Sequence, residues 1–243
     1  YQHFGVQPRF GVIGVISEHM TLAMFSPLMG APQPDWPINT RITGTPFYDS
    51  EDGRSPVLPP AVAAFLDAGP PPLVFSLGSA AVHAGEAYYR AAIAAAKALG
   101  HRCVILCGPE SALRGQDFGP EVCVAPYAPH SLLFPRALAV VHHGGAGSTA
   151  QALRSGRPIL TTPVFADQFD NARRTRRLGC GLTLNFRDFT AVTAERALRR
   201  LLADGGIAAR CAGIGPIIAA EDGAGVAAEL IADKKGSTRP DLL

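Results

Sequence analysis

The feature that most limits the fold of this 243-residue chain is a series of short apolar runs separated by helix-like segments. The runs lie at residues 73–77, 103–107, 122–126, 138–142, 158–162 and 181–184. Each run is apolar almost throughout instead of on alternate residues, which is typical of parallel strands covered on both faces. The sequence therefore predicts an α/β fold, with a doubly wound, mostly parallel six-stranded sheet of the Rossmann-like kind.

Helical patterns fill most of the spaces between these runs and continue after the last one. They lie at residues 86–99, 148–155, 170–178, 194–203, 207–219 and 225–233, with a short one at 61–66. The region before the first run is different: residues 1–55 are loop-rich, and the prolines of residues 56–72 are typical of a linker. We expect one complete domain at residues 73–235, followed by a flexible tail at 236–243.

Composition excludes several classes of protein. Apolar residues make up 47% of the chain and charged residues 17%, which excludes intrinsic disorder. A net charge of +2 is too small for a nucleic-acid-binding surface, and no apolar run reaches the ~18–20 residues of a membrane span. The five cysteines lack the paired spacing of a zinc site, so we expect buried thiols in the reducing cytoplasm.

Polar or glycine-rich residues follow four of the predicted strands. In parallel α/β sheets, ligands bind at the carboxyl ends of the strands, so these residues are the candidates for a site. They are Gly78 and Ser79 after the first run, Tyr127 after the third, His143, Gly145, Gly147, Ser148 and Thr149 after the fourth, and Asp167 and Gln168 after the fifth.

The glycine-rich stretch at residues 144–149 is the strongest of these signals. Its glycines let the backbone approach a ligand closely, and the helix that follows offers free N–H groups and partial positive charge, which suits a phosphate. Ser148 and Thr149 add hydroxyl donors, and His143 can donate a hydrogen bond or charge to a phosphoryl oxygen. The alternative for this stretch is an ordinary glycine turn with a serine cap.

The other candidates also have two interpretations each. Asp167 and Gln168 combine acceptors with a donor, as sugar hydroxyls require, but they could equally cap a helix. Tyr127 offers a flat face on which a base could stack, or it is a tyrosine of the core or its rim. Residues 145–150 also fit the dinucleotide fingerprint, but that motif normally follows the first strand of its domain rather than the fourth, which argues against NAD.

These motifs together resemble a known family. Residues 142–153 (HHGGAGSTAQAL), followed by Pro163, Asp167 and Gln168, are similar to the C-terminal donor-binding domain of GT-B glycosyltransferases of the family 1 type. That family includes sterol, macrolide and plant natural-product glucosyltransferases, and residues 127–134 are most similar to its sterol branch. The resemblance implies a GT-B C-terminal domain preceded by a remnant of the N-terminal, acceptor-binding domain at residues 1–55.

The resemblance also implies roles for individual residues. Gln151 lies where plant members have a glutamate that binds ribose, and Tyr127 lies where the family usually has a base-stacking tryptophan. By the same resemblance, His143 and the 144–149 turn would bind the diphosphate, with Gly78 and Ser79 nearby. Asp167 and Gln168 would bind the hydroxyls of the sugar.

The implied reaction is inverting, metal-independent transfer of a hexose from a UDP- or TDP-sugar to a hydroxyl of a lipophilic small molecule, such as a sterol. The chain contains no Asp-x-Asp motif, so we expect no metal and no cofactor. The family's catalytic base is a histidine in a Gly-His context near the start of the acceptor domain. Gly100 and His101 lie on the wrong side of the predicted sheet, and His19 is interpreted as structural. We therefore expect donor binding here and no catalytic residue in this chain.

Two alternatives remain open: a non-catalytic nucleotide-binding or auxiliary partner module of GT-B fold, and a sugar-nucleotide epimerase. The chain begins with Tyr1 instead of methionine, so we expect it to be a fragment whose N-terminal domain is missing. A basic cluster is interpreted as a solvated face, or as a peripheral membrane contact if the acceptor is a lipid. Its members are Arg173, Arg174, Arg176 and Arg177.

Overall fold

The structure, a computed structural model, describes residues 17, 19–49, 55–78 and 85–237. By their contacts, the described residues fall into two compact units. The larger contains residues 47–220, and the smaller combines residues 1–46 with 221–243.

The larger unit is built on a six-stranded sheet, as predicted. Its strands are β3 (Leu73–Ser76), β4 (Cys103–Leu106), β5 (Val122–Ala125), β6 (Ala139–His142), β7 (Ile159–Thr161) and β8 (Gly181–Thr183). Every neighbouring pair is parallel, and the order is β5-β4-β3-β6-β7-β8. Each of the apolar runs found in the sequence therefore forms one strand, and the prediction of a doubly wound parallel sheet is confirmed.

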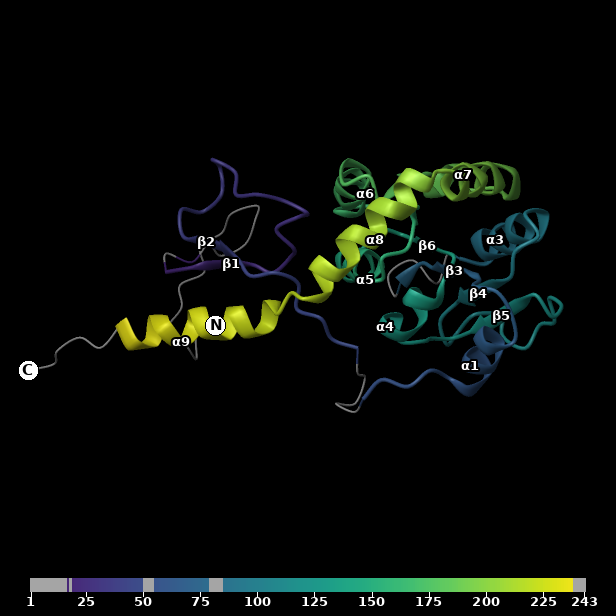
Figure 1. The fold of residues 1–243 in the computed structure, drawn as a ribbon, viewed down its shortest axis with the longest axis horizontal. Helices are drawn as coiled ribbons and strands as arrows, with labels where there is room; N and C mark the ends of the chain where they lie inside the picture. The colour runs from purple at the N-terminus through teal and green to yellow at the C-terminus, as the bar shows by residue number, and fades with distance from the viewer. Residues whose placement is uncertain (1–16, 18, 50–54, 79–84, 238–243) are drawn as a thin grey trace, which may run out of the picture. The chain divides into compact units, whose positions relative to one another are not determined.

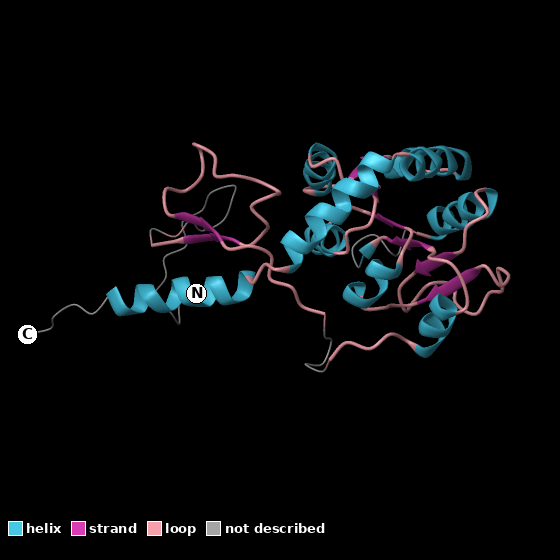
Figure 2. Ribbon diagram, in the orientation of Figure 1, coloured by secondary structure: helices cyan, strands magenta, loops and turns pink. Residues whose placement is uncertain are grey.

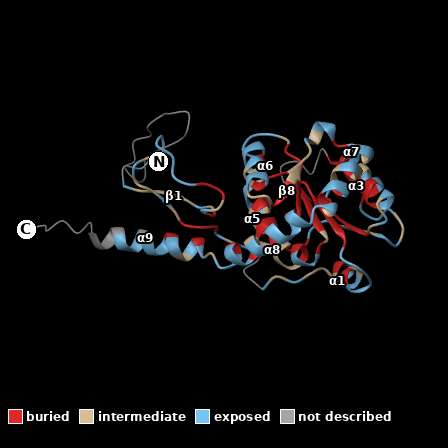
Figure 3. Ribbon diagram, turned by 45° about the horizontal axis from the view of Figure 1, so that its top comes forward, coloured by how far each residue is buried: buried red, intermediate tan, exposed pale blue. Residues whose placement is uncertain are grey.

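The strands are apolar throughout because the sheet is covered on both faces. Every residue of β3, β4, β6 and β7 is buried, and Figure 3 shows these strands as the buried centre of the unit. Figure 1 places α3 (Glu86–Ala98) and α7 (Ala191–Ala203) on one face, and α1 (Pro60–Asp67), α4 (His130–Leu133) and α5 (Ala146–Arg154) on the other. The remaining helices are α6 (Gln168–Arg177), which contacts β8, and α8 (Gly205–Ala219), which packs on α5.

The strand order reverses beside β3. The chain runs outward from β3 through β4 to β5, and then returns to place β6 on the other side of β3. Register pairs Ser76 at the end of β3 with His142 at the end of β6. Because crevices form where the strand order reverses, the segments that leave these two strand ends are the expected place for a ligand.

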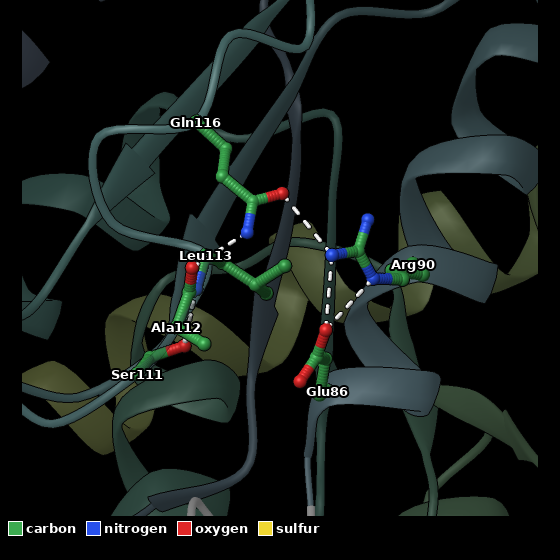
Figure 4. Close-up of polar contacts among 6 residues, drawn as sticks. All are labelled: Glu86, Arg90, Ser111, Ala112, Leu113 and Gln116. Atoms are coloured by element: carbon green, nitrogen blue, oxygen red, sulfur yellow. Dashed lines mark hydrogen bonds and ion pairs between the residues drawn. The ribbon is translucent and has the colours of Figure 1, made fainter.

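A loop, not a helix, joins β4 to β5 across residues 107–121, all of them described (Figure 2). Polar contacts hold this loop to α3 (Figure 4). The Arg90 guanidinium donates to Glu86 at 2.9 Å and to the side-chain oxygen of Gln116 at 3.1 Å. Lys97 donates to the carbonyl of Phe118 at 2.6 Å.

The predicted linker at residues 56–72 contains α1, which packs on the rest of the larger unit. Val62 and Leu66 are buried, and the Arg102 guanidinium lies 3.9 Å from the centre of the Phe65 ring. Arg102 also donates to the carbonyl of Pro70 at 3.1 Å. Part of the predicted linker is therefore fixed to the domain that follows it.

The smaller unit contains two short parallel strands, β1 (Thr21–Ala23) and β2 (Thr40–Ile42), and the helix α9 (Gly223–Ser237). The backbone N–H of Thr45 donates to the Glu221 carboxylate at 2.9 Å. Residues 221–235, assigned from the sequence to the donor-binding domain, group here with residues 1–46. The predicted domain boundaries therefore stay a prediction.

The five cysteines are all free. Four of them are buried, as predicted, and Cys123 is half-buried. Burial raises the pKa of the Cys103 thiol to about 12, which keeps it protonated. Within the described residues, no single helix has the length and apolar composition to cross a membrane; one bent pair, residues 191–203 with 205–233, meets those two criteria together.

Candidate functional site

The candidate site lies beyond the carboxyl ends of β3 and β6. Its central side chain is His143, which directly follows β6 and is 6% exposed. The imidazole lies between two glycines: a Cβ added to Gly78 or to Gly145 would collide with the ring. Gly78 also has φ +66°, in the left-handed region that favours glycine. Both glycines are therefore needed to seat this histidine.

The turn after His143 is fixed from both sides. Gly144 has φ +92°, and its N–H donates to Nδ1 of His142 at 3.0 Å. Its carbonyl accepts from Nδ2 of Asn171 at 2.9 Å. A Cβ on Gly144 would lie 2.9 Å from the carbonyl oxygen of Gln168, so the turn packs closely against the start of α6.

The first turn of α5 is open to a ligand. Among the described residues, no side chain caps this end of the helix, and its first backbone bond runs from the N–H of Thr149 to the carbonyl of Gly145. The N–H groups of the preceding helical residues have no acceptor within α5. Ala146 and Gly147 are exposed, and no atom of the described part of the chain lies within 4 Å of a Cβ added to Gly147. This turn offers an anion both N–H donors and the positive end of the helix dipole.

Buried polar atoms without a hydrogen-bond partner gather at the same edge of the sheet. An unsatisfied buried polar group costs about 1–3 kcal/mol, so such atoms are uncommon unless a ligand completes them. In the described residues, every one of them belongs to the end of a strand or to the segment that follows it. They are Ser131 Oγ, His142 Nε2, His143 Nδ1, Thr149 Oγ1, Gln151 Oε1 and Thr183 Oγ1.

The histidines of the site are neutral at pH 7. Burial lowers the pKa of His142 to about 3, helped by the neighbouring His143 and His130. Burial also lowers the pKa of His130 to about 4, against an opposing effect of Asp49. For His143, burial lowers the pKa and the Asp167 carboxylate opposes it. In the absence of a ligand, His143 therefore offers a hydrogen bond rather than a charge.

The buried His142 predicts how stability depends on pH. Its pKa is lower in the folded than in the unfolded chain, so the unfolded chain binds more protons as pH falls below 6.5 and stability declines. We expect the free energy of unfolding to fall by about 2 kcal/mol between pH 7 and pH 5 from this residue alone. Urea unfolding at both pH values measures it. His142→Asn, which retains an acceptor for Gly144, should show a smaller decrease, and an equal decrease would contradict the assignment.

Asp167 and Gln168 lie at the start of α6 but have different surroundings. Gln168 is 3% exposed, and its Oε1 accepts from the N–H groups of Val164 and Phe165 at 2.9 and 3.2 Å. Asp167 is exposed, and its Oδ2 accepts from Asn171 at 2.9 Å. Gln168 thus shapes the loop, while Asp167 extends into the solvent. Their predicted contacts with a sugar stay a prediction.

The other predicted residues are distributed around this edge. Tyr127 follows β5 and is 40% exposed, while Gln151, in the second turn of α5, is buried. Ser148 is half-buried in the first turn of α5. Ser79 lies outside the described residues. His101 lies two residues before the start of β4, so it belongs to the opposite edge of the sheet, as predicted.

Three residues of the site were not predicted. Asn171 joins the turn at Gly144 to Asp167. His130 begins α4 and stacks on Phe134 at 4.2 Å between ring centroids. Asp49 accepts a hydrogen bond from Gln151. Asn171 had a signal in the sequence because it lies one helical turn after Asp167, and His130 lies in the stretch that follows the third apolar run.

Comparison with known proteins identifies the family. A family model described as the C-terminal domain of erythromycin biosynthesis protein CIII-like proteins matches residues 90–232, more than half of the chain. The chain belongs to this EryCIII-like C-terminal domain family. The matched region contains the candidate site from Tyr127 through Gln168.

The relatives of this EryCIII-like domain include several named glycosyltransferases. The chain is 37% identical over 211 residues to O-mycaminosyltylonolide 6-deoxyallosyltransferase of Streptomyces fradiae, covering 85% of this chain and 48% of that protein. It is 37% identical over 185 residues to vancomycin aglycone glucosyltransferase of Amycolatopsis orientalis, covering 76% and 44%. With sterol 3-beta-glucosyltransferase of Emericella nidulans, identity is 31% over 218 residues, covering 85% and 15%. The chain thus spans about half the length of these relatives, or less.

Solved structures confirm the predicted GT-B fold. Spinosyn rhamnosyltransferase SpnG complexed with thymidine diphosphate superposes with a TM-score of 0.72 at 25% identity, covering 90% of this chain and 58% of that one. Its complex with spinosyn aglycone gives a TM-score of 0.71 at 26% identity, with the same coverage. The EryCIII-like chain therefore corresponds to part of the fold of a glycosyltransferase.

Proposed function

We propose that this chain is the donor-binding part of an inverting glycosyltransferase. The observation that carries the proposal is the open first turn of α5, with unpartnered buried polar atoms on His142, His143, Thr149 and Gln151, which end β6, follow it or belong to α5. A nucleoside diphosphate suits this arrangement, since its phosphate oxygens accept from N–H and hydroxyl donors and its ribose hydroxyls donate to acceptors. That a structural neighbour was solved with thymidine diphosphate supports the proposal.

The proposed roles follow from position. The first turn of α5 and the neutral imidazole of His143 hold the diphosphate, while the exposed Asp167 faces the hydroxyls of the sugar. Tyr127, half-exposed beyond β5, stacks on the base.

The reaction proposed for the whole protein is a direct displacement. An acceptor hydroxyl attacks the anomeric carbon, the bond from that carbon to the diphosphate oxygen breaks, and the configuration inverts. The electron pair leaves with the diphosphate, and the hydroxyl proton passes to a base that we assign to no residue of this chain. The N–H groups of α5 stabilise the charge that develops on the leaving group, which is electrostatic catalysis by preorganised donors.

The acceptor proposed is a lipophilic small molecule with a free hydroxyl. The names of the relatives give O-mycaminosyltylonolide, the vancomycin aglycone and sterols as what they glycosylate, which supports a small-molecule acceptor. A cytoplasmic location and a peripheral membrane contact through the cluster of Arg173, Arg174, Arg176 and Arg177 remain predictions. A non-catalytic nucleotide-binding module remains the alternative function.

Calorimetric titration of the chain with UDP and TDP tests the proposal. We expect saturable binding of at least one of them, and no transfer of sugar by the chain alone. A chain that binds neither nucleotide would overturn the proposal. Transfer by the chain alone would show that the catalytic base is present after all.

Removal of metal ions is expected to leave nucleotide affinity unchanged. The proposed site holds the diphosphate with backbone N–H groups and neutral side chains, so no cation is needed to neutralise it. The measurement is a UDP titration without EDTA, with EDTA, and again after Mg²⁺ has been added back to the chelated sample. A loss of affinity on chelation that Mg²⁺ restores would show that the site is metal-dependent.

A further inference from the structure

Two of the five cysteines are in direct contact in the larger unit. The thiol of Cys211, in α8, donates to the carbonyl oxygen of Cys180, the residue before β8, with its sulfur 3.2 Å from that oxygen. The same carbonyl accepts from the N–H of Ile159 in β7, so the sheet fixes its position. Both thiols are free, and the two residues are 0% and 2% exposed. The sulfur of Cys211 is therefore held against Cys180 in the interior.

The surroundings of this pair give its two thiols different reactivity. Interaction with the Cys211 thiol lowers the pKa of the Cys180 thiol, burial opposes this, and the nearby Arg210 lowers the pKa further. Arg210 is close because a Cβ added to Gly179 would lie 3.3 Å from its Nε. The pKa of the Cys211 thiol is raised by its hydrogen bonding with Cys180 and by burial. Cys180 is thus the better nucleophile, and Cys211 is the thiol that keeps its proton.

The other three cysteines are not arranged in this way. The register of β4 and β5 pairs Cys103 with Val122, and Cys123 comes one residue later. Because successive side chains of a strand point to opposite faces, Cys103 and Cys123 lie on opposite faces of the sheet. Cys107 comes four residues after Cys103, about 13 Å along an extended chain, whereas disulfides need Cα atoms about 4.4–6.8 Å apart.

The contact joins two parts of the larger unit that are held in different ways. Strand β8 has three residues and lies at the edge of the sheet, next to β7. Helix α8 is packed closely on the end of α5, since a Cβ added to Gly215 would lie 2.9 Å from the Cα of Gly156. A short edge strand opens locally more easily than the centre of a sheet, which gives a small molecule access to Cys180.

We propose that Cys180 and Cys211 form an oxidation-sensitive site, where hydrogen peroxide converts the two thiols to a disulfide that joins β8 to α8. The sulfur of Cys180 attacks one oxygen of the peroxide, the O–O bond breaks, and the other oxygen leaves as water after taking up a proton. The sulfur of Cys211 then attacks the resulting sulfenic acid, the S–O bond breaks, and a second water takes the Cys211 proton. Two electrons pass from the thiols to the peroxide.

The disulfide lies away from the candidate functional site. Cys180 precedes β8, so the bond is at the amino ends of the strands, whereas the candidate site is at their carboxyl ends. The inference therefore goes beyond the proposed function, and its test needs no nucleotide. The bond closes a loop between residues 180 and 211 and so restricts the unfolded chain, which stabilises the folded domain.

Peptide mapping of the oxidised chain tests the proposal. The full chain is treated with hydrogen peroxide, its remaining thiols are blocked with iodoacetamide in urea, and it is digested with trypsin without reduction. Trypsin separates the two cysteines into residues 178–187 and 211–234. We expect mass spectrometry to find these two peptides joined, and dithiothreitol to release them.

Thermal unfolding gives a second readout. We expect oxidation to raise the midpoint of unfolding by about 5–10 °C, and dithiothreitol to reverse the increase. Cys180→Ser and Cys211→Ser should each abolish the linked peptides and the increase. The matched control, Cys123→Ser, removes a half-buried thiol on β5 and should retain both.

The peptide map of the wild type can overturn the inference without any variant. Sulfinic acid at Cys180 with no linked peptides would show that the two sulfurs do not meet. Linked peptides that contain Cys103, Cys107 or Cys123 in place of this pair would assign the oxidation to another site. A midpoint that rises equally in Cys211→Ser would show that this disulfide does not stabilise the domain.

Discussion

Replacing His143 with alanine is expected to lower the affinity of the chain for UDP by about ten- to a hundredfold. The imidazole is seated between Gly78 and Gly145, and its Nδ1 is buried without a partner. A hydrogen bond to a charged group contributes about 1.5–3 kcal/mol, which corresponds to that loss. Calorimetric titration of the wild type and the variant with UDP measures it.

The matched control is His101→Ala. This second histidine precedes β4 at the opposite edge of the sheet, so its removal should leave UDP affinity as it is in the wild type. Thermal unfolding of both variants separates a loss of binding from a loss of folding. A folded His143→Ala variant with wild-type affinity would remove His143 from the site.

Replacing Gly144 with alanine is expected to affect both stability and binding. The residue has φ +92°, and its new Cβ would lie 2.9 Å from the carbonyl oxygen of Gln168. We expect a loss of about 2–4 kcal/mol in the free energy of unfolding, combining backbone strain with overpacking. UDP affinity should fall as well, because a shifted turn displaces the first N–H groups of α5. Urea unfolding and a UDP titration give the two values.

Gly147→Ala is the control that separates the two effects. No described residue lies within 4 Å of the added Cβ, and alanine favours a helix over glycine by up to about 1 kcal/mol. We expect wild-type stability or better, together with weaker UDP binding, since the methyl group lies where the diphosphate approaches α5. Unchanged UDP affinity in this variant would move the diphosphate away from that turn. A Gly144→Ala variant as stable as the wild type would show that the turn can relax.

The sheet could be predicted from the sequence because each strand is a local signal. A strand buried on both faces must be apolar throughout, so every strand appeared as a continuous run, and residues such as His142 and Gly144 marked where one ended. The short helix α4 was missed because four residues between Pro129 and Phe134 give too little pattern to distinguish a helix from a turn.

The polar contacts of the site could not be predicted in the same way. The bond between Gln151 and Asp49 joins residues 102 positions apart, so no local pattern in the sequence signals it. Gln168 was predicted to contact a sugar from its amide chemistry and from the family resemblance, and that contact stays a prediction. The structure uses its oxygen for the backbone of Val164 and Phe165, a choice that depends on the conformation of the loop.

Asn171 has a consequence for how donor preference could change during evolution or engineering. Its single amide nitrogen donates one hydrogen to the carbonyl of Gly144 and the other to the carboxylate of Asp167, each at 2.9 Å. These two hydrogen bonds fix the position of the loop proposed to contact the sugar relative to the turn proposed to hold the diphosphate. A loop transplanted from a relative would lose these two hydrogen bonds unless the start of that relative's own α6 were transplanted with it. The smallest exchangeable module therefore runs from the end of β7 into the first turn of α6.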